Sequence, residues 1–191
     1  MTYFNGNDID GDCCIMEAFL MDLTFYNGRQ MGGKKIYTNP KIGGSILFGT
    51  TWRGFIKNDK LTHEKIMKKI DPETGLYETK VMTDFPELRL VFDEFASLYF
   101  NDFEFTHIQI NKNFKCLPHR DKANIGESVL ISLGDFTGGK TGVDFTDGRQ
   151  ILDSHNQPVK FNGSRYTHWV EDFEGTRFSL VFFNSKKLSN Q

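Results

Sequence analysis

The second half of the chain alternates short apolar and polar positions with the period of β-strands. From residue 103 onward, runs rich in β-branched and aromatic residues are separated by Gly, Asn and Asp. These runs cover residues 103–110, 127–134, 140–145, 164–170 and 176–183. Short strands at this spacing are typical of a β-sandwich or a small barrel. The pattern therefore predicts an all-β second half.

Two helices are predicted in the first half, from apolar residues at helical spacing. Residues 61–70 place Ile66, Met67 and Ile70 on one face and lysines on the others. A second helix is predicted to begin at Pro86, because proline suits the first turn, and to run through residue 100. The apolar face that we expect it to bury consists of Leu88, Val91, Phe92, Phe95 and Leu98.

The acidic run at residues 7–12, Asn-Asp-Ile-Asp-Gly-Asp, has the composition of a calcium-binding loop. In one register of the EF-hand pattern Cys13 replaces the turn glycine, and in the other Gly6 replaces the first ligand. Neither register supplies a complete ligand set, so we interpret this run as a polar turn. Helices that cover one face of the β-structure would bury the apolar faces of both.

Length and composition predict one intracellular, soluble domain over residues 1–191, with a basic and helical portion at 1–102 and a β core at 103–184. With 38% hydrophobic and 25% charged residues, the chain matches neither a disordered nor a membrane-spanning protein. No apolar run approaches the roughly 20 residues that a bilayer requires, and the start lacks the pattern of a signal peptide. The three cysteines form no CxxC motif and are expected to be reduced thiols.

Charge is distributed unevenly along the chain. The net charge of −2 alone would argue against a polyanionic partner. However, residues 28–70 hold ten Lys or Arg against two acidic residues, a net charge of +8, so the remainder carries −10. This asymmetry is compatible with a surface that faces a polyanion, and equally with a solvated basic face.

Three residues of the second half have the spacing of a metal site. His119 and Asp121 lie two apart on an extended segment, so their side chains point the same way, and His168 comes from a distant predicted strand. Two imidazoles and a carboxylate on one face of an octahedron leave three positions open, as in non-haem Fe(II) oxygenases. Zinc would favour a four-coordinate site. Taken alone, His168 is equally compatible with a hydrogen-bonded histidine of the core.

Arg177 follows His168 by nine residues, with a predicted turn between them. A hairpin folded near residues 172–173 would place Arg177 opposite His168. An arginine inside an apolar strand is costly unless it meets a carboxylate. That carboxylate would belong either to an ordinary Asp or to a dicarboxylate that chelates the metal at its other end, with a hydrogen bond from Ser179. The remaining histidines, His63, His107 and His155, are assigned to a helix face, a strand and a loop, without a role.

The stretches 110–139 and 167–183 carry a resemblance to a known family. They resemble the 2-oxoglutarate- and Fe(II)-dependent dioxygenase superfamily and, more narrowly, its ten-eleven-translocation and J-binding-protein-like branch. The first stretch matches the family pattern at fixed spacing in its metal pair, in Asn124, Gly126 and Ser128, and in the glycine-rich residues 134–139. We also expect a hairpin at 134–139 with positive φ at Gly138 or Gly139. The resemblance covers about residues 103–184.

The resemblance implies an α+β protein whose core is a double-stranded β-helix (a jelly-roll, cupin-like fold) with flanking N-terminal helices. It implies that His119, Asp121 and His168 bind Fe(II), and that the co-substrates are 2-oxoglutarate and O2. Arg177 would bind the distal carboxylate of 2-oxoglutarate. Residues that would line the site around these groups are Ser179, Asn111 and Asn124; Asn113 is expected to lie at a strand end or turn.

The branch also implies a substrate, the methyl group of a pyrimidine in DNA, either 5-methylcytosine or thymine. Such a base must be flipped out of the duplex to be reached. The basic segment 28–70 would then hold the DNA phosphates, with Lys34, Lys35, Arg53 and the stacking surface of Trp52 as candidate contacts. The chain lacks the Cys-rich zinc-binding region of the animal enzymes. Alternatives are a peptide hydroxylase of the prolyl-hydroxylase type, oxidation of a mononucleotide or small molecule, and a non-catalytic nucleic-acid-binding module.

Overall fold

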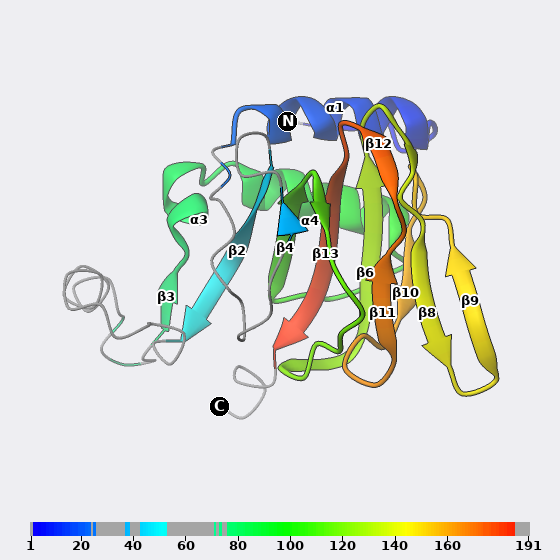
Figure 1. The fold of residues 1–191 in the computed structure, drawn as a ribbon. Coiled ribbons are helices and arrows are strands. Elements are labelled where there is room, and N and C mark those ends of the chain that lie inside the picture. Colours follow the sequence, from blue (N-terminus) through cyan, green and yellow to red (C-terminus); the bar gives the residue numbers. More distant parts are fainter. Residues whose placement is uncertain are drawn as a thin grey trace.

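The computed structural model describes residues 2–23, 25, 37–38, 43–52, 71, 73 and 76–185 (Figure 1). Its helices are α1 (Ile9–Met21), α3 (Lys80–Asp84) and α4 (Leu88–Tyr99). Its strands are β1 (Tyr37–Thr38), β2 (Gly44–Trp52), β3 (Leu76–Glu78), β4 (His107–Lys112), β5 (Phe114–Lys115), β6 (Asn124–Leu133), β7 (Phe136–Gly138), β8 (Thr141–Phe145), β9 (Gly148–Leu152), β10 (Val159–Phe161), β11 (Thr167–Val170), β12 (Phe173–Gly175) and β13 (Phe178–Ser185).

The strands form two principal antiparallel sheets. The larger sheet has six strands in the order β10-β6-β13-β4-β2-β3, and the smaller has three in the order β11-β8-β9. The pairs β12-β7 and β1-β5 form two further sheets of two strands each. The segment after β5 runs beside β11, because His119 and His168 exchange backbone hydrogen bonds of 3.0 Å in both directions.

The order of the strands along the chain confirms the predicted double-stranded β-helix. From β4 in the large sheet the chain passes beside β11, returns to the large sheet at β6, and then enters the small sheet at β8 and β9. It continues with β10 in the large sheet, β11 in the small sheet and β13 in the large sheet. Successive strands thus alternate between two facing sheets, which is the winding of a jelly-roll.

The alternation of side chains gives the large sheet two different faces. On β4, Ile108 and Ile110 are fully buried in the hydrophobic core, and Phe182 of β13 packs beside them. Figure 1 shows α4 crossing behind this sheet, where Phe92 contacts Phe48 and Phe182 with ring centroids 5.0 and 6.2 Å apart. Each such buried side chain contributes roughly 1.5–3 kcal/mol. The opposite face of the sheet is left to line a cavity.

Residues 9–12 form the first turn of α1 and Asp8 is its N-cap, so the prediction of a polar turn at 7–12 was wrong. The Asp8 carboxylate accepts the Gly11 N–H at 3.2 Å and caps α1. Asp12 is buried and accepts the backbone N–H groups of Asn5 and Gly6 at 2.8 and 2.7 Å, together with the hydroxyl of Tyr99. The acidic composition therefore serves helix capping and a buried network, which outweigh the low helix propensity of glycine.

The second predicted helix is present with shifted bounds. α4 begins at Leu88, two residues later than predicted, because Pro86 and Glu87 form a turn. Leu98 was expected in the core but is 42% exposed, and Ala96 is buried on the inner face instead. The predicted helix at 61–70 lies outside the described residues.

Two further local features are an unpredicted strand in the N-terminal half and the predicted backbone of the glycine-rich stretch. β2 was not predicted, because its glycines and threonines weaken the strand signal, yet Ile46 and Phe48 alternate into the core as in any half-buried strand. The positive φ predicted at 138–139 is confirmed, with φ of 77° at Gly138 and 67° at Gly139. A Cβ at Gly138 would lie 2.3 Å from the Asp172 carbonyl oxygen, so β12 approaches β7 closely only with glycine here.

Candidate metal centre

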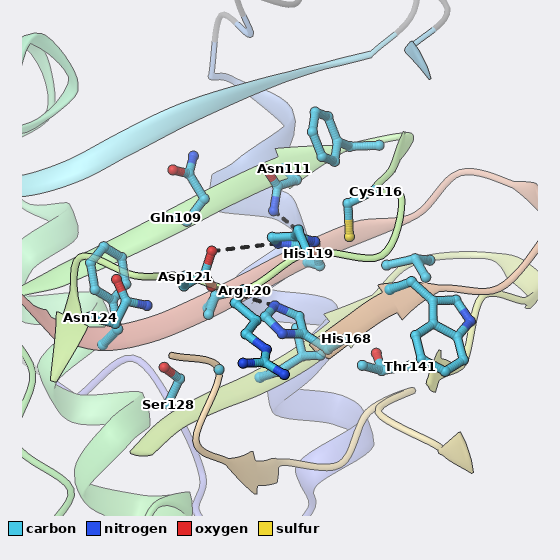
Figure 2. A pocket seen from close by; sticks show the side chains of 18 of the residues that line it. Gln109, Asn111, Cys116, His119, Arg120, Asp121, Asn124, Ser128, Thr141 and His168 are labelled. Atoms are coloured by element: carbon cyan, nitrogen blue, oxygen red, sulfur yellow. Dashed lines mark hydrogen bonds and ion pairs between the residues drawn. The ribbon is translucent and has the colours of Figure 1, made fainter. Parts of the chain in front are cut away.

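His119, Asp121 and His168 meet on one wall of a cavity of about 760 Å³ between the two sheets (Figure 2). Their ligand atoms all lie within 4.8 Å of one another. Asp121 Oδ1 is 3.5 Å from His119 Nε2, and Asp121 Oδ2 is 3.5 Å from His168 Nε2. Among the described residues, this is the one group of His, Cys, Asp or Glu side chains with such a geometry.

The backbone fixes which nitrogen of each histidine faces the centre. His119 Nδ1 lies 2.8 Å from the Leu117 carbonyl oxygen, and His168 Nδ1 lies 3.1 Å from that of Tyr166. A carbonyl can only accept, so each Nδ1 carries a proton, and each Nε2 faces Asp121 and is the nitrogen available to a metal. The backbone N–H of Asp121 is held in turn by the Gly163 carbonyl at 2.9 Å. The three side chains are thus oriented before any metal binds.

The charges of the cluster suit a divalent cation. Burial raises the pKa of Asp121, but its hydrogen bonds with His119 and His168 outweigh burial and hold that pKa well below its usual range. Burial lowers the pKa of His119, yet its hydrogen bonds with Asp121 and Cys116 raise it to about 10. A cation that binds here displaces the proton shared in this network and meets an ionised carboxylate. The donor set, two nitrogens and one carboxylate oxygen, therefore fits Fe(II).

Arg177 lines the same cavity and is 1% exposed. Its guanidinium donates to Ser132 Oγ at 2.7 Å, while its Nε has no hydrogen-bond partner. The rings of Phe136 and Phe173 lie 5.5 and 5.6 Å from the guanidinium carbon. Within the described part of the chain no carboxylate forms an ion pair with it. Burial lowers the pKa of Arg177 to about 10, so it is still a cation at neutral pH.

The predicted hairpin that would place Arg177 opposite His168 was wrong. β11, which carries His168, pairs with β8, whereas β13, which follows Arg177, pairs with β4 and β6 of the other sheet. Between them, β12 pairs with β7. The chain therefore crosses from one sheet to the other instead of turning back on itself. Both side chains still line the one cavity, from opposite sheets.

The polar residues beside Arg177 form a hydrogen-bonded row across the large sheet. Gln109 Nε2 donates to Ser45 Oγ at 2.6 Å, Ser45 Oγ donates to Asn111 Oδ1 at 2.7 Å, and Asn111 Nδ2 donates to Ser179 Oγ at 3.1 Å. Ser179 therefore keeps its own hydroxyl hydrogen for another acceptor. Across the cavity, Thr141 Oγ1 is buried without a partner. Asn113 lies in a turn with φ of 47°, and its Oδ1 accepts the Arg177 backbone N–H at 2.8 Å.

Sequence reasoning missed several lining residues. Gln109, Ser128, Thr141 and His107 all line the cavity, and the last had been assigned no role. The signal was present in the alternation, because a polar side chain at every second position of an apolar strand indicates a polar inner face. Asn124, which the resemblance had indicated, is buried and lines the cavity at the start of β6.

The four candidate DNA contacts in segment 28–70 stay predictions. Trp52 is the last residue of β2, and its side chain is not among the described ones. Arg53, Lys34 and Lys35 lie outside the described residues, as does most of the segment 28–70. In the part of the chain that the structure describes, no helix has both the length and the apolar character needed to cross a membrane.

His107 gives a testable pH dependence of stability. Burial lowers its pKa from 6.5 to about 4, so at intermediate pH the unfolded chain binds a proton that the folded protein excludes. Stability contributed by the neutral ring is present above pH 6.5 and lost as pH falls to 4. We expect His107 to account for a loss of about 3 kcal/mol in unfolding free energy across this window. His107→Phe should remove that part of the slope.

Urea unfolding of wild type and His107→Phe at pH 7 and pH 4 checks this expectation. The control is His155→Phe, which changes an exposed histidine outside the cavity and should keep the wild-type slope. An equal loss of stability in all three proteins would show that the buried ring of His107 does not exclude the proton.

Comparisons with known proteins give similarity of fold at low sequence identity. No protein-family model and no curated protein matches the chain. A prolyl hydroxylase from Trichoplax adhaerens, in complex with a hypoxia inducible factor peptide, is 15% identical over 100% of this chain and 86% of its own, with a TM-score of 0.49. A 2OG-Fe(II) oxygenase family oxidoreductase from Burkholderia pseudomallei is 19% identical over 89% and 76%, with a TM-score of 0.46.

NgTET1 in complex with 5mC DNA is 16% identical over 93% of this chain and 88% of its own, with a TM-score of 0.43. The prolyl hydroxylase structure thus contains a peptide and the NgTET1 structure contains DNA. The narrower ten-eleven-translocation resemblance stays a prediction. The chemistry has to be inferred from the residues of this chain.

Proposed function

We propose that this chain is an Fe(II)- and 2-oxoglutarate-dependent dioxygenase that hydroxylates the methyl group of a pyrimidine base, 5-methylcytosine or thymine, in DNA. The observation that carries the enzymatic part is Arg177. Arg177 is a buried cation without a carboxylate partner among the described residues, and it lines the same cavity as a His-Asp-His cluster that has the geometry of a metal site. A buried charge of this kind is costly, so the arrangement is explained by an anionic ligand that also reaches the metal.

The metal cluster and Arg177 would bind the two ends of one dicarboxylate. His119, Asp121 and His168 would hold Fe(II), which supplies the coordination of 2-oxoglutarate and the activation of O2 that couple decarboxylation to hydroxylation. Arg177 would pair with the distal carboxylate through its unpartnered Nε and its terminal nitrogens. Ser179 would donate its remaining hydroxyl hydrogen to that carboxylate, held in place by Asn111.

The other end of the cavity supports a flat, uncharged substrate. Its lining there includes the amide of Asn124, the hydroxyl of Ser128 and the rings of Phe161 and Phe183. Amides and hydroxyls can read the edge of a base, and aromatic rings can pack on its face. The segment 28–70, with its net charge of +8, would hold the phosphates on either side.

Reversing charge in this segment should weaken DNA binding. Lys34→Glu with Lys35→Glu is expected to lower affinity and to reduce the slope of log affinity against log salt by about two, since each phosphate contact contributes about one. Fluorescence anisotropy with a methylated duplex over a range of salt concentrations measures both quantities. Reversal of Lys80 and Lys160, two exposed lysines outside the segment, makes the same change in net charge. An equal effect of both double variants would argue against a specific phosphate-binding role of the segment.

Nucleoside mass spectrometry tests the proposed function. Methylated and unmethylated DNA are incubated with the protein, Fe(II), 2-oxoglutarate and O2, then digested to nucleosides. A hydroxymethyl, formyl or carboxyl pyrimidine is the expected product. Succinate without a modified base would move the substrate to a peptide or a small molecule. Absence of succinate with every candidate substrate would leave a non-catalytic binding module.

A further inference from the structure

The exposed residues of the cavity lining all belong to one short segment. Among the described residues that line the cavity, the exposed ones are Leu117, Pro118, Arg120, Lys122 and Ala123. The other described lining residues are buried or half-buried. A residue that is exposed and also lines a cavity marks its opening. Residues 117–123, here called the rim segment, therefore lie at the opening of the cavity.

Hydrogen bonds fix the rim segment to the metal cluster and to β11. The Leu117 carbonyl oxygen lies 2.8 Å from His119 Nδ1, which donates to it. Arg120 Nε donates to Thr167 Oγ1 at 3.1 Å. Pro118 has a fixed φ and restricts the residue before it to an extended conformation. The rim segment is thus ordered before any substrate binds, which lowers the entropic cost of binding.

The rim segment carries two cations that have no carboxylate partner. Arg120 and Lys122 flank Asp121, whose carboxylate faces the two histidines of the cluster. Neither cation forms an ion pair within the described part of the chain, whereas Lys140 and Arg149 each pair with an aspartate. Consecutive Cα atoms are about 3.8 Å apart, so both cations begin one residue away from a candidate metal ligand. The opening therefore favours an anion beside the metal centre.

An exposed apolar side chain lies at the same opening. Leu117 is 49% exposed, and Pro118 beside it is exposed as well. A single exposed leucine is ordinary on a protein surface, but this one lines a cavity and precedes Arg120 by three residues and Lys122 by five. Proteins that enter a DNA duplex combine these two elements, an apolar wedge between bases and cations on the phosphates. A small anion would use the cations alone.

We propose that the rim segment enters the DNA duplex at the target base. Leu117 fills the space that the flipped base leaves in the stack, and Arg120 and Lys122 hold the neighbouring phosphates. This inference rests on the proposed function, in which the base must leave the duplex. Unstacking a base costs free energy, and the contacts of Leu117 with the remaining bases offset part of it. Because His119 and Asp121 belong to the same segment, the base leaves the stack directly beside the metal cluster.

The wedge is tested with a duplex that carries 2-aminopurine next to 5-methylcytosine, since this fluorophore brightens when its neighbour leaves the stack. Wild type without iron should raise the fluorescence. Leu117→Ala should reduce that rise to less than half. With iron, Leu117→Ala should lose at least about tenfold more kcat/KM on the duplex than on the single strand of the same sequence, because an unpaired base needs no wedge. Leu90→Ala is the control, since Leu90 is 62% exposed on α4 and is not in the cavity lining.

The phosphate contacts are tested with the double variant Arg120→Gln with Lys122→Gln. It should bind the methylated duplex more weakly, and the slope of log affinity against log salt should fall by about two. Fluorescence anisotropy without iron measures both quantities. Lys80→Gln with Lys160→Gln makes the same change in net charge at two exposed lysines outside the cavity lining, and it should keep the wild-type slope.

The wedge role is overturned if Leu117→Ala keeps the wild-type rise in fluorescence, or if it loses activity equally on duplex and single strand. The phosphate role is overturned if the two double variants have the same salt slope. A wild-type protein that does not bind DNA overturns both roles and leaves a peptide or a small molecule at the opening. Fluorescence and affinity are measured without iron, so they judge the rim segment even if wild type forms no succinate, a result that would overturn the proposed dioxygenase activity instead.

Discussion

Replacing Arg177 with methionine is expected to abolish the binding of 2-oxoglutarate and to leave the protein without ligand at least as stable as wild type. The guanidinium is 1% exposed and has Ser132 Oγ as its polar partner. Removing one partner of a buried ion pair costs about 3–5 kcal/mol, so affinity should fall by a hundredfold or more. Isothermal titration with Mn(II) in place of Fe(II) measures this loss without turnover.

The expected gain in stability follows from the same geometry. Without a bound anion, the cation of Arg177 is desolvated, and burial lowers its pKa to about 10. Replacing a buried charge by an apolar side chain of similar length is often neutral or stabilising by about 1–4 kcal/mol. Urea unfolding of ligand-free wild type and Arg177→Met should therefore show no loss of stability in the variant, whereas addition of 2-oxoglutarate should stabilise wild type alone.

Arg165→Met is the matched control, because Arg165 is exposed and stacks on Tyr166 outside the cavity lining. It should bind 2-oxoglutarate as wild type does. If Arg177→Met lost several kcal/mol of stability but still bound the co-substrate, the arginine would have a structural role and the anion site would lie elsewhere.

Replacing His119 with alanine is expected to lower turnover below detection and to weaken metal binding by more than about a hundredfold. Loss of residues that merely support metal ligands typically costs ten- to a hundredfold, and His119 would be a ligand itself. The backbone hydrogen bonds that His119 exchanges with His168 do not involve its side chain, so the fold should persist. Metal titration and succinate formation are measured on the same preparation.

His155→Ala provides the control for a histidine outside the cavity. Its ring contacts Phe136 and the Gly134 carbonyl oxygen, away from the metal cluster. Wild-type metal affinity in His119→Ala would remove His119 from the site, whatever happens to turnover.

The proximity of the three cluster residues could be predicted, because one step of that prediction is local. Two residues apart on an extended segment, His119 and Asp121 must point the same way, and the structure brings His168 within 4.8 Å of them. The double-stranded β-helix followed from the period of the runs after residue 103 together with the resemblance. The proposed roles of these residues stay predictions.

What could not be predicted depends on contacts between distant parts of the chain. The false hairpin between His168 and Arg177 arose because residues 173–175 pair with residues 136–138, a choice that local turn signals do not contain. α1 was missed because its acidic start has the composition of a turn. The hydrogen bond from the Tyr99 hydroxyl to Asp12, which comes from a distant part of the chain, cannot be predicted from the local sequence. The position of His107 in the cavity lining required the register of β4 against β13, which places its ring on Phe183.

The most direct test of the account is the amount of succinate formed from 2-oxoglutarate by wild type with Fe(II), O2 and 5-methylcytosine DNA. We predict succinate in equal amount to the oxidation steps found on the base, dependent on both Fe(II) and 2-oxoglutarate, and absent in His119→Ala and Arg177→Met. Succinate at the level of the metal-free control, with every candidate substrate present, would contradict the assignment of this site as a dioxygenase centre.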